Sequence, residues 1–273
     1  MTRSQLFGRT AAPALCLVIA CCATVQTTQP GAVGIERKQT MLVSEEAVEQ
    51  AAARAYATEL QHAEQSGKLN SDQALTARVR RISERLIPVT AAFRPDAPGW
   101  KWEVNALSTP EMNAYAMPGG KIMVYSGLVE KLHLSDAELA AVLGHEISHA
   151  LREHTRERVS RAYQQQLALA GLALATGIDS SAIDLANTVA SVTFQLPHSR
   201  EQEAEADIMG LELMARAGYD PHAAVSLWNK MMAADQSAPP QFLSTHPSPA
   251  NRVAELERHI PQVEPLYQAA ARG

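Results

Sequence analysis

Residues 144–149 read Gly-His-Glu-Ile-Ser-His and contain the pattern H-E-x-x-H. In a helix, His145 and His149 lie one turn apart on the same face, so both imidazoles can reach one ion at about 2.0–2.1 Å. Glu146 points about 100° further around the helix, where it can take a proton from a metal-bound water rather than bind the metal. The pattern therefore predicts a zinc site with Glu146 as general base.

The sequence around this stretch favours a helix. Ser135 and Glu138 form a capping box, and the helix that they open is predicted to continue to about Arg161. The alternative is that two histidines share a helix face by chance. With nine histidines in 273 residues, chance produces this pattern in about one or two per cent of such sequences.

A third zinc ligand has to come from another part of the chain. The metzincin pattern requires Gly and His at positions that here hold Arg152 and Thr155. His154 is one residue out of that register and is predicted to be a solvated surface histidine. The same long helix therefore offers no third ligand.

An acidic segment at residues 199–207, Ser-Arg-Glu-Gln-Glu-Ala-Glu-Ala-Asp, is the better candidate. Glu203 and Asp207 are four apart and share a helix face, so Glu203 can bind zinc while Asp207 fixes the tautomer of a ligand histidine. Glu201 and Glu205 are also four apart, so spacing alone does not choose between the pairs. The alternative interpretation is an ordinary solvated acidic face.

The N-terminus has the layout of a secretory signal peptide over residues 1–20, with arginines ahead of an apolar run. That run is too short for a spanning helix. Residues 18–21, Val-Ile-Ala-Cys, resemble a bacterial lipobox, in which the cysteine, here Cys21, receives lipid. A plain signal peptide with incidental cysteines is the alternative. Residues 21–40 show no periodicity and are predicted to be a flexible tether.

Composition excludes several classes of protein. The chain is 46% hydrophobic and 19% charged with a formal charge of −5, and no basic face emerges, so nucleic acid is not an expected partner. Its three cysteines all lie within the first 22 residues, so the rest has neither a disulfide framework nor a thiolate metal site. Residues 41–273 are predicted to form one metallopeptidase domain. The sequence does not indicate an oligomeric state.

Periodicity and end signals predict a mainly helical protein with a small sheet. Alternation at Trp100, Trp102 and Val104 predicts a strand, and two extended segments flank the turn Pro118-Gly119-Gly120. The apolar residues 167–175 are predicted to be a core helix or to flank the active site. Further helices are predicted over 45–66, 72–87 and 200–217, and from 220 and 248 onward.

Four segments resemble the HtpX- and Oma-type zinc metallopeptidases, metallopeptidase family forty-eight, which includes the CaaX prenyl proteases. They are Asn-Ala-Tyr-Ala-Met-Pro-Gly-Gly at 113–120, the H-E-x-x-H helix, Glu-Ala-Glu-Ala-Asp at 203–207 and Thr-His-Pro-Ser-Pro-Ala-Asn-Arg at 245–252. The resemblance implies a gluzincin fold with one Zn²⁺ per chain. It selects Glu203 as third ligand and Asp207 as its supporting residue. Among the members, the chain looks most like the small bacterial lipoproteins linked to envelope protein quality control.

The resemblance also assigns roles outside the metal ligands. His246 and Arg252 match family residues that contact substrate, and His246 is expected to donate to the reaction's oxyanion or to plug the zinc as a fourth ligand. A packing role beside the last helix is the alternative for His246. The segment Asn113, Ala114, Tyr115 and Ala116 is expected to bind peptide as an added strand. The alternative is an ordinary core hairpin.

The leading hypothesis is a periplasm-facing, membrane-tethered zinc endopeptidase that hydrolyses peptide bonds of unfolded or misassembled envelope proteins. Cys22, rather than Asp, follows Cys21, and by resemblance to lipoprotein sorting signals this favours the outer membrane in a host that has one. A second hypothesis is a chaperone-like binding protein of the same fold with an occluded zinc site. A third is a structural lipoprotein without zinc. The intact Glu146 argues against an inactive enzyme.

Overall fold

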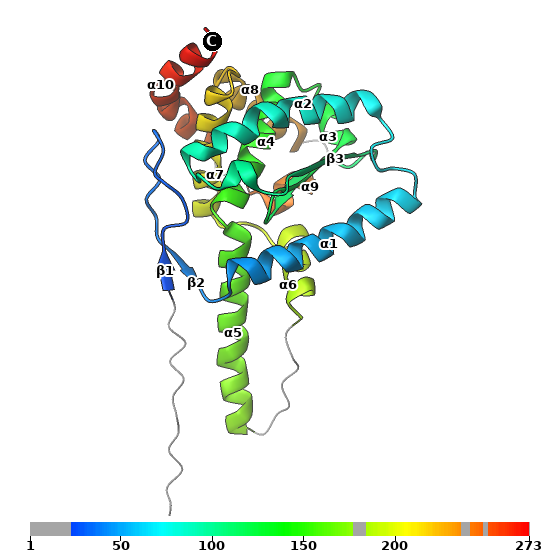
Figure 1. Cartoon of the computed structure of the whole chain (residues 1–273), viewed down its shortest axis with the longest axis vertical. Coiled ribbons are helices and arrows are strands. Elements are labelled where there is room, and N and C mark those ends of the chain that lie inside the picture. The colour runs from blue at the N-terminus through cyan, green and yellow to red at the C-terminus, as the bar shows by residue number, and fades with distance from the viewer. Residues whose placement is uncertain (1–22, 177–183, 236–240, 248–250, 273) are drawn as a thin grey trace, which may run out of the picture.

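The computed structural model describes residues 23–176, 184–235, 241–247 and 251–272. The described chain is mainly helical with a small sheet (Figure 1), which confirms the predicted α+β class. The predicted signal peptide and Cys21 lie outside the described residues. The helices are α1 (Glu45–Gln65), α2 (Gln73–Val89), α3 (Ser126–Lys131), α4 (Asp136–Leu151), α5 (His154–Thr176), α6 (Leu185–Phe194), α7 (Arg200–Arg216), α8 (His222–Asp235), α9 (Gln241–Thr245) and α10 (Arg252–Ala270).

A three-stranded sheet has the order β3-β5-β4, with β4 at one edge. β3 (Glu103–Leu107) is parallel to β5 (Lys121–Tyr125), and β4 (Ala114–Met117) is antiparallel to β5. Gly119 and Gly120 adopt φ of +75° and +81° in the turn between β4 and β5, a conformation that favours glycine. The two predicted extended segments are thus a hairpin. The other predicted strand begins only at Glu103, after both tryptophans.

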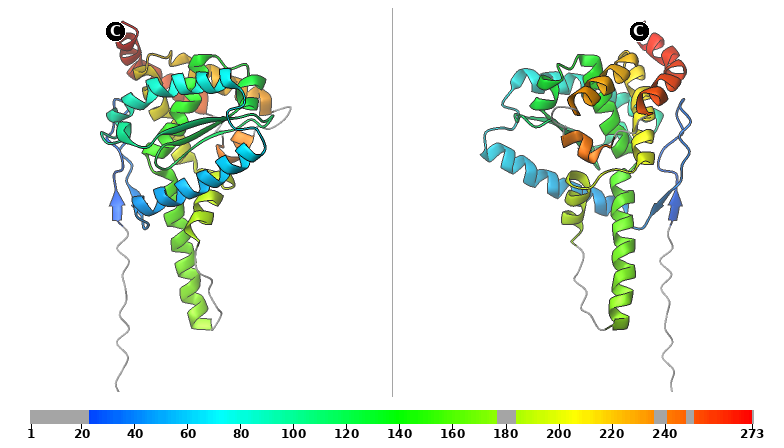
Figure 2. Two further views of the ribbon diagram at one scale, coloured as in Figure 1. Left: turned by 45° about the vertical axis from the view of Figure 1, so that its right-hand side comes forward. Right: turned by 180° about the vertical axis from the view of Figure 1, so that it is seen from behind.

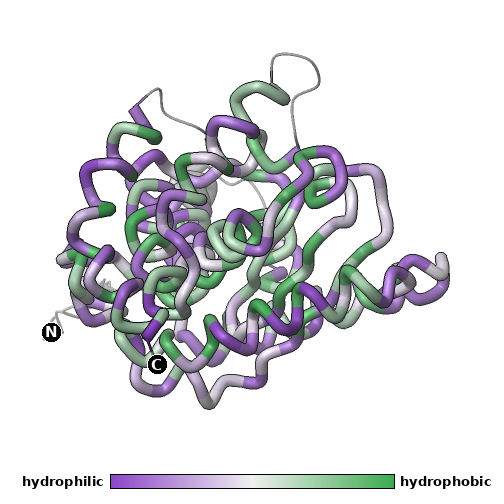
Figure 3. Tube along the Cα trace, turned by 90° about the horizontal axis from the view of Figure 1, so that it is seen from above, coloured by the Kyte–Doolittle hydropathy of each residue, from purple (hydrophilic) through white to green (hydrophobic). Residues whose placement is uncertain are grey.

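The sheet separates two hydrophobic clusters, with alternate side chains of each strand on opposite faces. Ala114, Ala116, Ile122 and Val124 belong to the larger cluster, whereas Tyr115, Met117, Met123 and Tyr125 belong to the smaller one. Figure 2 shows α2 along one side of the sheet and α1 along the other. Seen from above, the tube alternates between polar and apolar stretches along the helices, as expected for helices with one buried face (Figure 3).

The long helix predicted from Ser135 is broken. α4 begins with the predicted capping box but ends at Leu151, and α5 starts at His154. Between them, Glu153 takes a left-handed φ of 52°, which turns the chain into a new direction. The break arises where the buried Arg152 contacts residues distant in the sequence, and a local periodicity does not contain that information.

The flexible tether predicted over residues 21–40 is wrong for residues 23–40, which pack against the body. β1 (Ala23–Val25) pairs antiparallel with β2 (Gln39–Met41). The backbone N–H of Val33 donates to the Glu212 carboxylate over 3.0 Å, and the Arg37 side chain pairs with Glu157 at 2.7 Å. Such long-range polar partners compensate for the absence of an apolar periodicity in this segment.

Helix α5 extends away from the rest of the molecule (Figures 1 and 2). Leu167 is 54% exposed, so at this residue the predicted core position is wrong, while the alternative position beside the active site stays a prediction. The other side chains of the apolar run 167–175 lie outside the described part. Among the described residues, no helix combines the length and apolar character that crossing a membrane requires.

Candidate metal centre

Two glycines let α4 and α7 cross at backbone contact. A Cβ on Gly144 would lie 2.9 Å from the carbonyl oxygen of Gly210, and a Cβ on Gly210 would lie 2.8 Å from the amide nitrogen of His145. Either side chain would force the helices apart. Because the crossing is so close, the N-terminal turns of α7 present Glu203 and Asp207 directly to the histidines of α4.

His145, His149 and Glu203 converge on one point. The Nε2 atoms of the two histidines are 3.1 Å apart, and the Glu203 carboxylate oxygens lie 3.3 Å from Nε2 of His149 and 3.5 Å from Nε2 of His145. Donors held about 2.0–2.1 Å from a tetrahedral ion lie about 3.3 Å from one another. Two imidazoles and a carboxylate at these spacings fit zinc.

The same centre includes His246, which comes from the segment after α9. Its Nδ1 is 3.2 Å from Nε2 of His145 and 3.0 Å from Oε1 of Glu203, so all four side chains can direct a donor atom at one ion. Its ring stacks on Phe242 with a centroid distance of 4.3 Å and on His198 with one of 4.9 Å. His246 thus occupies the position that the plug hypothesis requires.

Asp207 lies behind the first histidine. Its Oδ1 is 3.0 Å from Nδ1 of His145, which leaves Nε2 of that ring directed at the centre. Burial lowers the pKa of His145, but hydrogen bonds that its ring donates to the carboxylates of Asp207 and Glu203, together with their negative charges, outweigh it and raise this pKa to about 9. Burial also opposes ionisation of Glu203, yet His246 and the two other histidines hold its pKa well below the usual range. The carboxyl of Asp207 therefore lies against Nδ1 of His145, and that of Glu203 lies against Nε2 of both histidines.

Arg252 is paired with the two carboxylates. Its guanidinium donates to Oδ2 of Asp207 over 2.6 Å and to Oε2 of Glu203 over 2.8 Å, and it lies 3.4 Å over the ring of Trp228. The residue is 2% exposed. The guanidinium is thus held by the buried negative charges of Glu203 and Asp207, and its predicted contact with substrate stays a prediction.

Glu146 is buried beside the centre. Its Oε1 has no hydrogen-bond partner among the described residues and lies 3.6 Å from Nε2 of His246. Burial raises the pKa of Glu146, while His246, His145 and the backbone N–H of Ala116 lower it. A buried carboxylate with a free oxygen is the arrangement that a general base needs.

The prediction that His154 is a solvated surface residue is wrong. The residue is fully buried instead of solvated, with Nδ1 at 2.8 Å from Nδ1 of His149 and Nε2 at 2.9 Å from Oε2 of Glu205. In an unbroken helix, a residue five positions after His149 would lie about 140° away from it. The turn at Glu153 changes the direction of the chain, so that the His154 ring lies beside the His149 ring. Glu201, in contrast, keeps a 62% exposed side chain.

The segment predicted to bind peptide is the edge strand β4 and the residue before it. Ala114, Tyr115 and Ala116 are all buried, and Asn113 accepts a hydrogen bond from the amide of Tyr125. The ring of Tyr115 packs edge-on against Phe194 of α6 at 5.0 Å, within the smaller hydrophobic cluster. The three residues are thus covered, main chain included, where the strand passes next to Glu146, and their predicted contact with peptide stays a prediction.

Comparison with protein families agrees with this centre. The family described as peptidase family M48 matches residues 73–260, which is more than half of the chain. This chain belongs to peptidase family M48. The resemblance to the HtpX- and Oma-type metallopeptidases is confirmed. M48 metalloproteases use zinc, which also confirms, at the level of the family, the enzyme class predicted from the sequence.

Curated M48 relatives include mitochondrial and bacterial proteins. The chain is 34% identical over 198 residues to the mitochondrial metalloendopeptidase OMA1 of Schizosaccharomyces pombe, covering 72% of this chain and 56% of that protein. It is 40% identical over 154 residues to OMA1 of Arabidopsis thaliana, covering 56% and 30%. The beta-barrel assembly-enhancing protease of Escherichia coli is 28% identical over 214 residues, covering 74% and 42%. The chain thus matches little more than half of the length of these relatives, or less.

Proposed function

We propose that this protein is a membrane-tethered zinc metalloendopeptidase that hydrolyses peptide bonds of unfolded or misassembled envelope proteins. One observation carries the catalytic part: Nε2 of His145, Nε2 of His149 and the Glu203 carboxylate lie within 3.1–3.5 Å of one another. These are the donors that would hold one Zn²⁺. Glu146 stands beside them with a buried, free oxygen.

Zinc, Glu146, Asp207 and Arg252 would have separate roles in peptide hydrolysis. Bound zinc supplies Lewis-acid chemistry, polarising the peptide carbonyl and lowering the pKa of a water towards about 7. Glu146 accepts the proton of that water at Oε1 and delivers it to the leaving amine. Asp207 holds His145 in the tautomer that directs Nε2 inward, and Arg252 fixes Asp207 and Glu203.

The substrate would bind along β4. This strand is the edge of its sheet, and the backbone amide of Ala116 donates a hydrogen bond that lowers the pKa of Glu146. An extended peptide that pairs with the edge would bring its backbone to the base, and hydrogen bonds to main chain tolerate many sequences. Broad tolerance suits an enzyme that acts on unfolded proteins. Residues Asn113 to Ala116 are the proposed contact.

Access to the centre requires a movement. His145, Glu146, His149 and His246 are between 2% and 4% exposed and Glu203 is fully buried. His246 is held by Phe242, on α9, and by His198, whose amide donates to Thr245 over 2.9 Å. We infer that His246 is a plug that substrate displaces.

The plug makes a prediction for His246→Ala. Because Nδ1 of His246 lies among the metal donors, its removal should weaken zinc retention or raise basal cleavage of a loose substrate such as casein. His62→Ala, at an exposed histidine far from the centre, is the control. A lower kcat with unchanged zinc affinity would instead identify His246 as an oxyanion donor. Wild-type kinetics together with wild-type zinc affinity would exclude both roles.

The proposed cellular location is supported by the sequence of the N-terminus and by the name of one relative. The lipobox-like residues 18–21 support lipidation of Cys21, which would hold the protein to a membrane, facing the periplasm. Cys22 after Cys21 favours the outer membrane. The name of the E. coli relative, a beta-barrel assembly-enhancing protease, supports an envelope substrate.

Replacing Cys21 by alanine tests this location. The variant is expected to lack lipid and to be found either uncleaved or in the soluble fraction. Because Cys22 is the next residue, a variant with alanine at both positions is the control for lipidation shifted to Cys22. Mass spectrometry of the wild-type N-terminus is the direct measurement. A free cysteine there, or a different N-terminal residue, would exclude the lipoprotein proposal without affecting the catalytic one.

Cleavage of casein tests the function itself. The purified protein is expected to cleave casein, to stop when a zinc chelator is added and to contain one mole of zinc per chain. Binding of casein without cleavage would favour the chaperone-like alternative. A chain without zinc would leave only a structural role.

A further inference from the structure

The two nitrogens of His149 have different neighbours. Nε2 faces the centre, 3.3 Å from Glu203 and 3.1 Å from His145. Nδ1 lies 2.8 Å from Nδ1 of His154. A neutral imidazole that binds a metal through Nε2 carries its proton on Nδ1. His149 therefore donates to His154, which accepts at Nδ1.

A carboxylate completes this chain of hydrogen bonds. A neutral His154 that accepts at Nδ1 has its proton on Nε2, and Nε2 lies 2.9 Å from Oε2 of Glu205. Glu205 thus sets the tautomer of His154, and His154 sets that of His149. His145 has a direct carboxylate partner in Asp207, whereas the support of His149 comes from a carboxylate one imidazole away.

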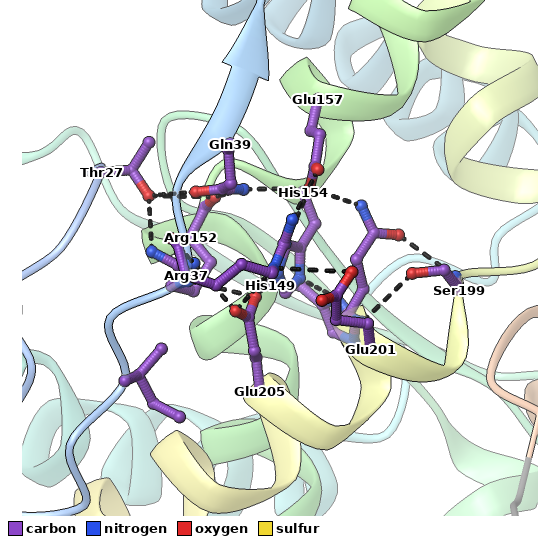
Figure 4. Close-up of polar contacts among 12 residues, drawn as sticks. Thr27, Arg37, Gln39, His149, Arg152, His154, Glu157, Ser199, Glu201 and Glu205 are labelled. Atoms are coloured by element: carbon purple, nitrogen blue, oxygen red, sulfur yellow. Dashed lines mark hydrogen bonds and ion pairs between the residues drawn. The ribbon is translucent and has the colours of Figure 1, made fainter. Parts of the chain in front are cut away.

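Two guanidinium groups hold Glu205. Arg37 donates to both of its oxygens over 2.8 and 2.9 Å, and Arg152 donates to them over 2.9 and 3.3 Å (Figure 4). Glu205 and Arg152 are buried, at 6% and 0% exposed. In such an environment an ion pair keeps the carboxylate charged and in one orientation, which a lone buried carboxylate would not maintain.

Arg37 and Arg152 are themselves positioned by the N-terminal segment, which we define as residues 23–41. Arg152 donates to the hydroxyls of Thr27 and Thr28 over 3.1 Å each and to the carbonyl of Arg37 over 2.9 Å. The Gln39 side chain donates to the carbonyl of Arg152 over 2.7 Å. Figure 4 shows these groups gathered between the N-terminal segment and the ends of α4 and α7.

We propose that His154 is a positioning residue for the zinc ligand His149, held in place by Glu205 and, through Arg37, by the N-terminal segment. The inference rests on the proposed zinc centre and extends it: residues that precede the matched family region become part of the metal site. Displacing the N-terminal segment would loosen the support of His149 without touching a metal ligand.

The experiment compares two replacements of His154 in the full holoenzyme. Glutamine can accept a hydrogen bond from His149 and donate one to Glu205, whereas leucine can do neither. His154→Leu is expected to raise the rate of zinc loss to EDTA about 10- to 100-fold, the usual effect of removing a ligand's partner. His154→Gln is expected to stay near wild type. The absorption spectrum of the cobalt-substituted protein should change in the Leu variant only.

A matched pair of arginines tests the N-terminal segment. Arg37 and Arg161 both pair with Glu157, but only Arg37 also contacts Glu205. Arg37→Met should lose zinc faster than Arg161→Met, yet more slowly than His154→Leu because Arg152 remains. Equal rates in the two arginine variants would exclude the part played by the N-terminal segment.

Other outcomes would overturn the role of His154. Wild-type zinc retention in folded His154→Leu would do so, and so would equal losses in the Leu and Gln variants. If His154→Leu does not fold, Glu205→Gln takes its place, with faster zinc loss expected. His149, His154 and His198 are close enough to hold an ion themselves. A second zinc in the wild type that His154→Leu lacks would replace the proposal by a second metal site. A wild type without zinc would refute the proposed function instead.

Discussion

Replacing Glu146 by glutamine is expected to lower kcat/KM for casein at least about 100-fold while the fold and zinc content stay unchanged. The amide keeps the shape of the side chain but cannot accept the proton that Oε1 takes. Glu146 is not among the four side chains whose donor atoms converge on the ion. Activity and metal retention are therefore expected to separate in this variant. Casein hydrolysis and zinc analysis of the same preparation measure both.

The control for this substitution is Glu201→Gln, at a carboxylate with a 62% exposed side chain on the first turn of α7. It should leave activity unchanged. Near-wild-type activity in Glu146→Gln would refute the role of general base. A variant that binds substrate without cutting it can serve as a trap. Proteins that co-purify from membrane fractions with Glu146→Gln, but not with the active enzyme, would identify the natural substrates.

Local sequence was sufficient to predict the two histidines of the centre but not its carboxylate. The spacing of His145 and His149 and the capping box at Ser135 predicted a shared helix face, and that helix face is present in the structure. Spacing could not distinguish Glu203 from Glu201 or Glu205, and the family resemblance made that choice. The structure gives the physical reason: the crossing at Gly144 and Gly210 orients α7. The glycine in each helix, Gly144 and Gly210, is the sequence feature from which this close crossing could have been predicted.

Long-range polar contacts escaped the sequence analysis. Arg37 contacts Glu205 across 168 positions of the chain, and no periodicity near Arg37 indicates that its side chain is partly buried. These contacts hold residues 23–40, which were predicted to be a flexible tether, against the rest of the protein. They also involve Arg152, at the break between α4 and α5 that places His154 in the interior. The pairing of Arg252 with Glu203 and Asp207 was not predicted, because spacing does not reveal which charges surround a cation. Buried ionic networks are thus the part of this protein that pattern alone cannot predict.

Replacing Glu203 by alanine is expected to remove most of the bound zinc, whereas Glu201→Ala should retain it. The loss should exceed the 10- to 100-fold change in affinity typical of residues behind the ligands, since Glu203 is fully buried and its oxygens lie 3.3 and 3.5 Å from the ligand nitrogens of the two histidines.

Glu203→Ala also leaves the buried Arg252 with Asp207 as its remaining carboxylate, so the variant should be less stable even without metal. Glu203→Gln keeps the side-chain volume and separates the two effects. It should recover part of the stability but little of the zinc, because a neutral amide is a poorer ligand than a carboxylate. Zinc content, with thermal unfolding of the metal-free proteins, measures both. Equal zinc loss in Glu201→Ala and Glu203→Ala would show that the wrong face of α7 had been assigned to the metal.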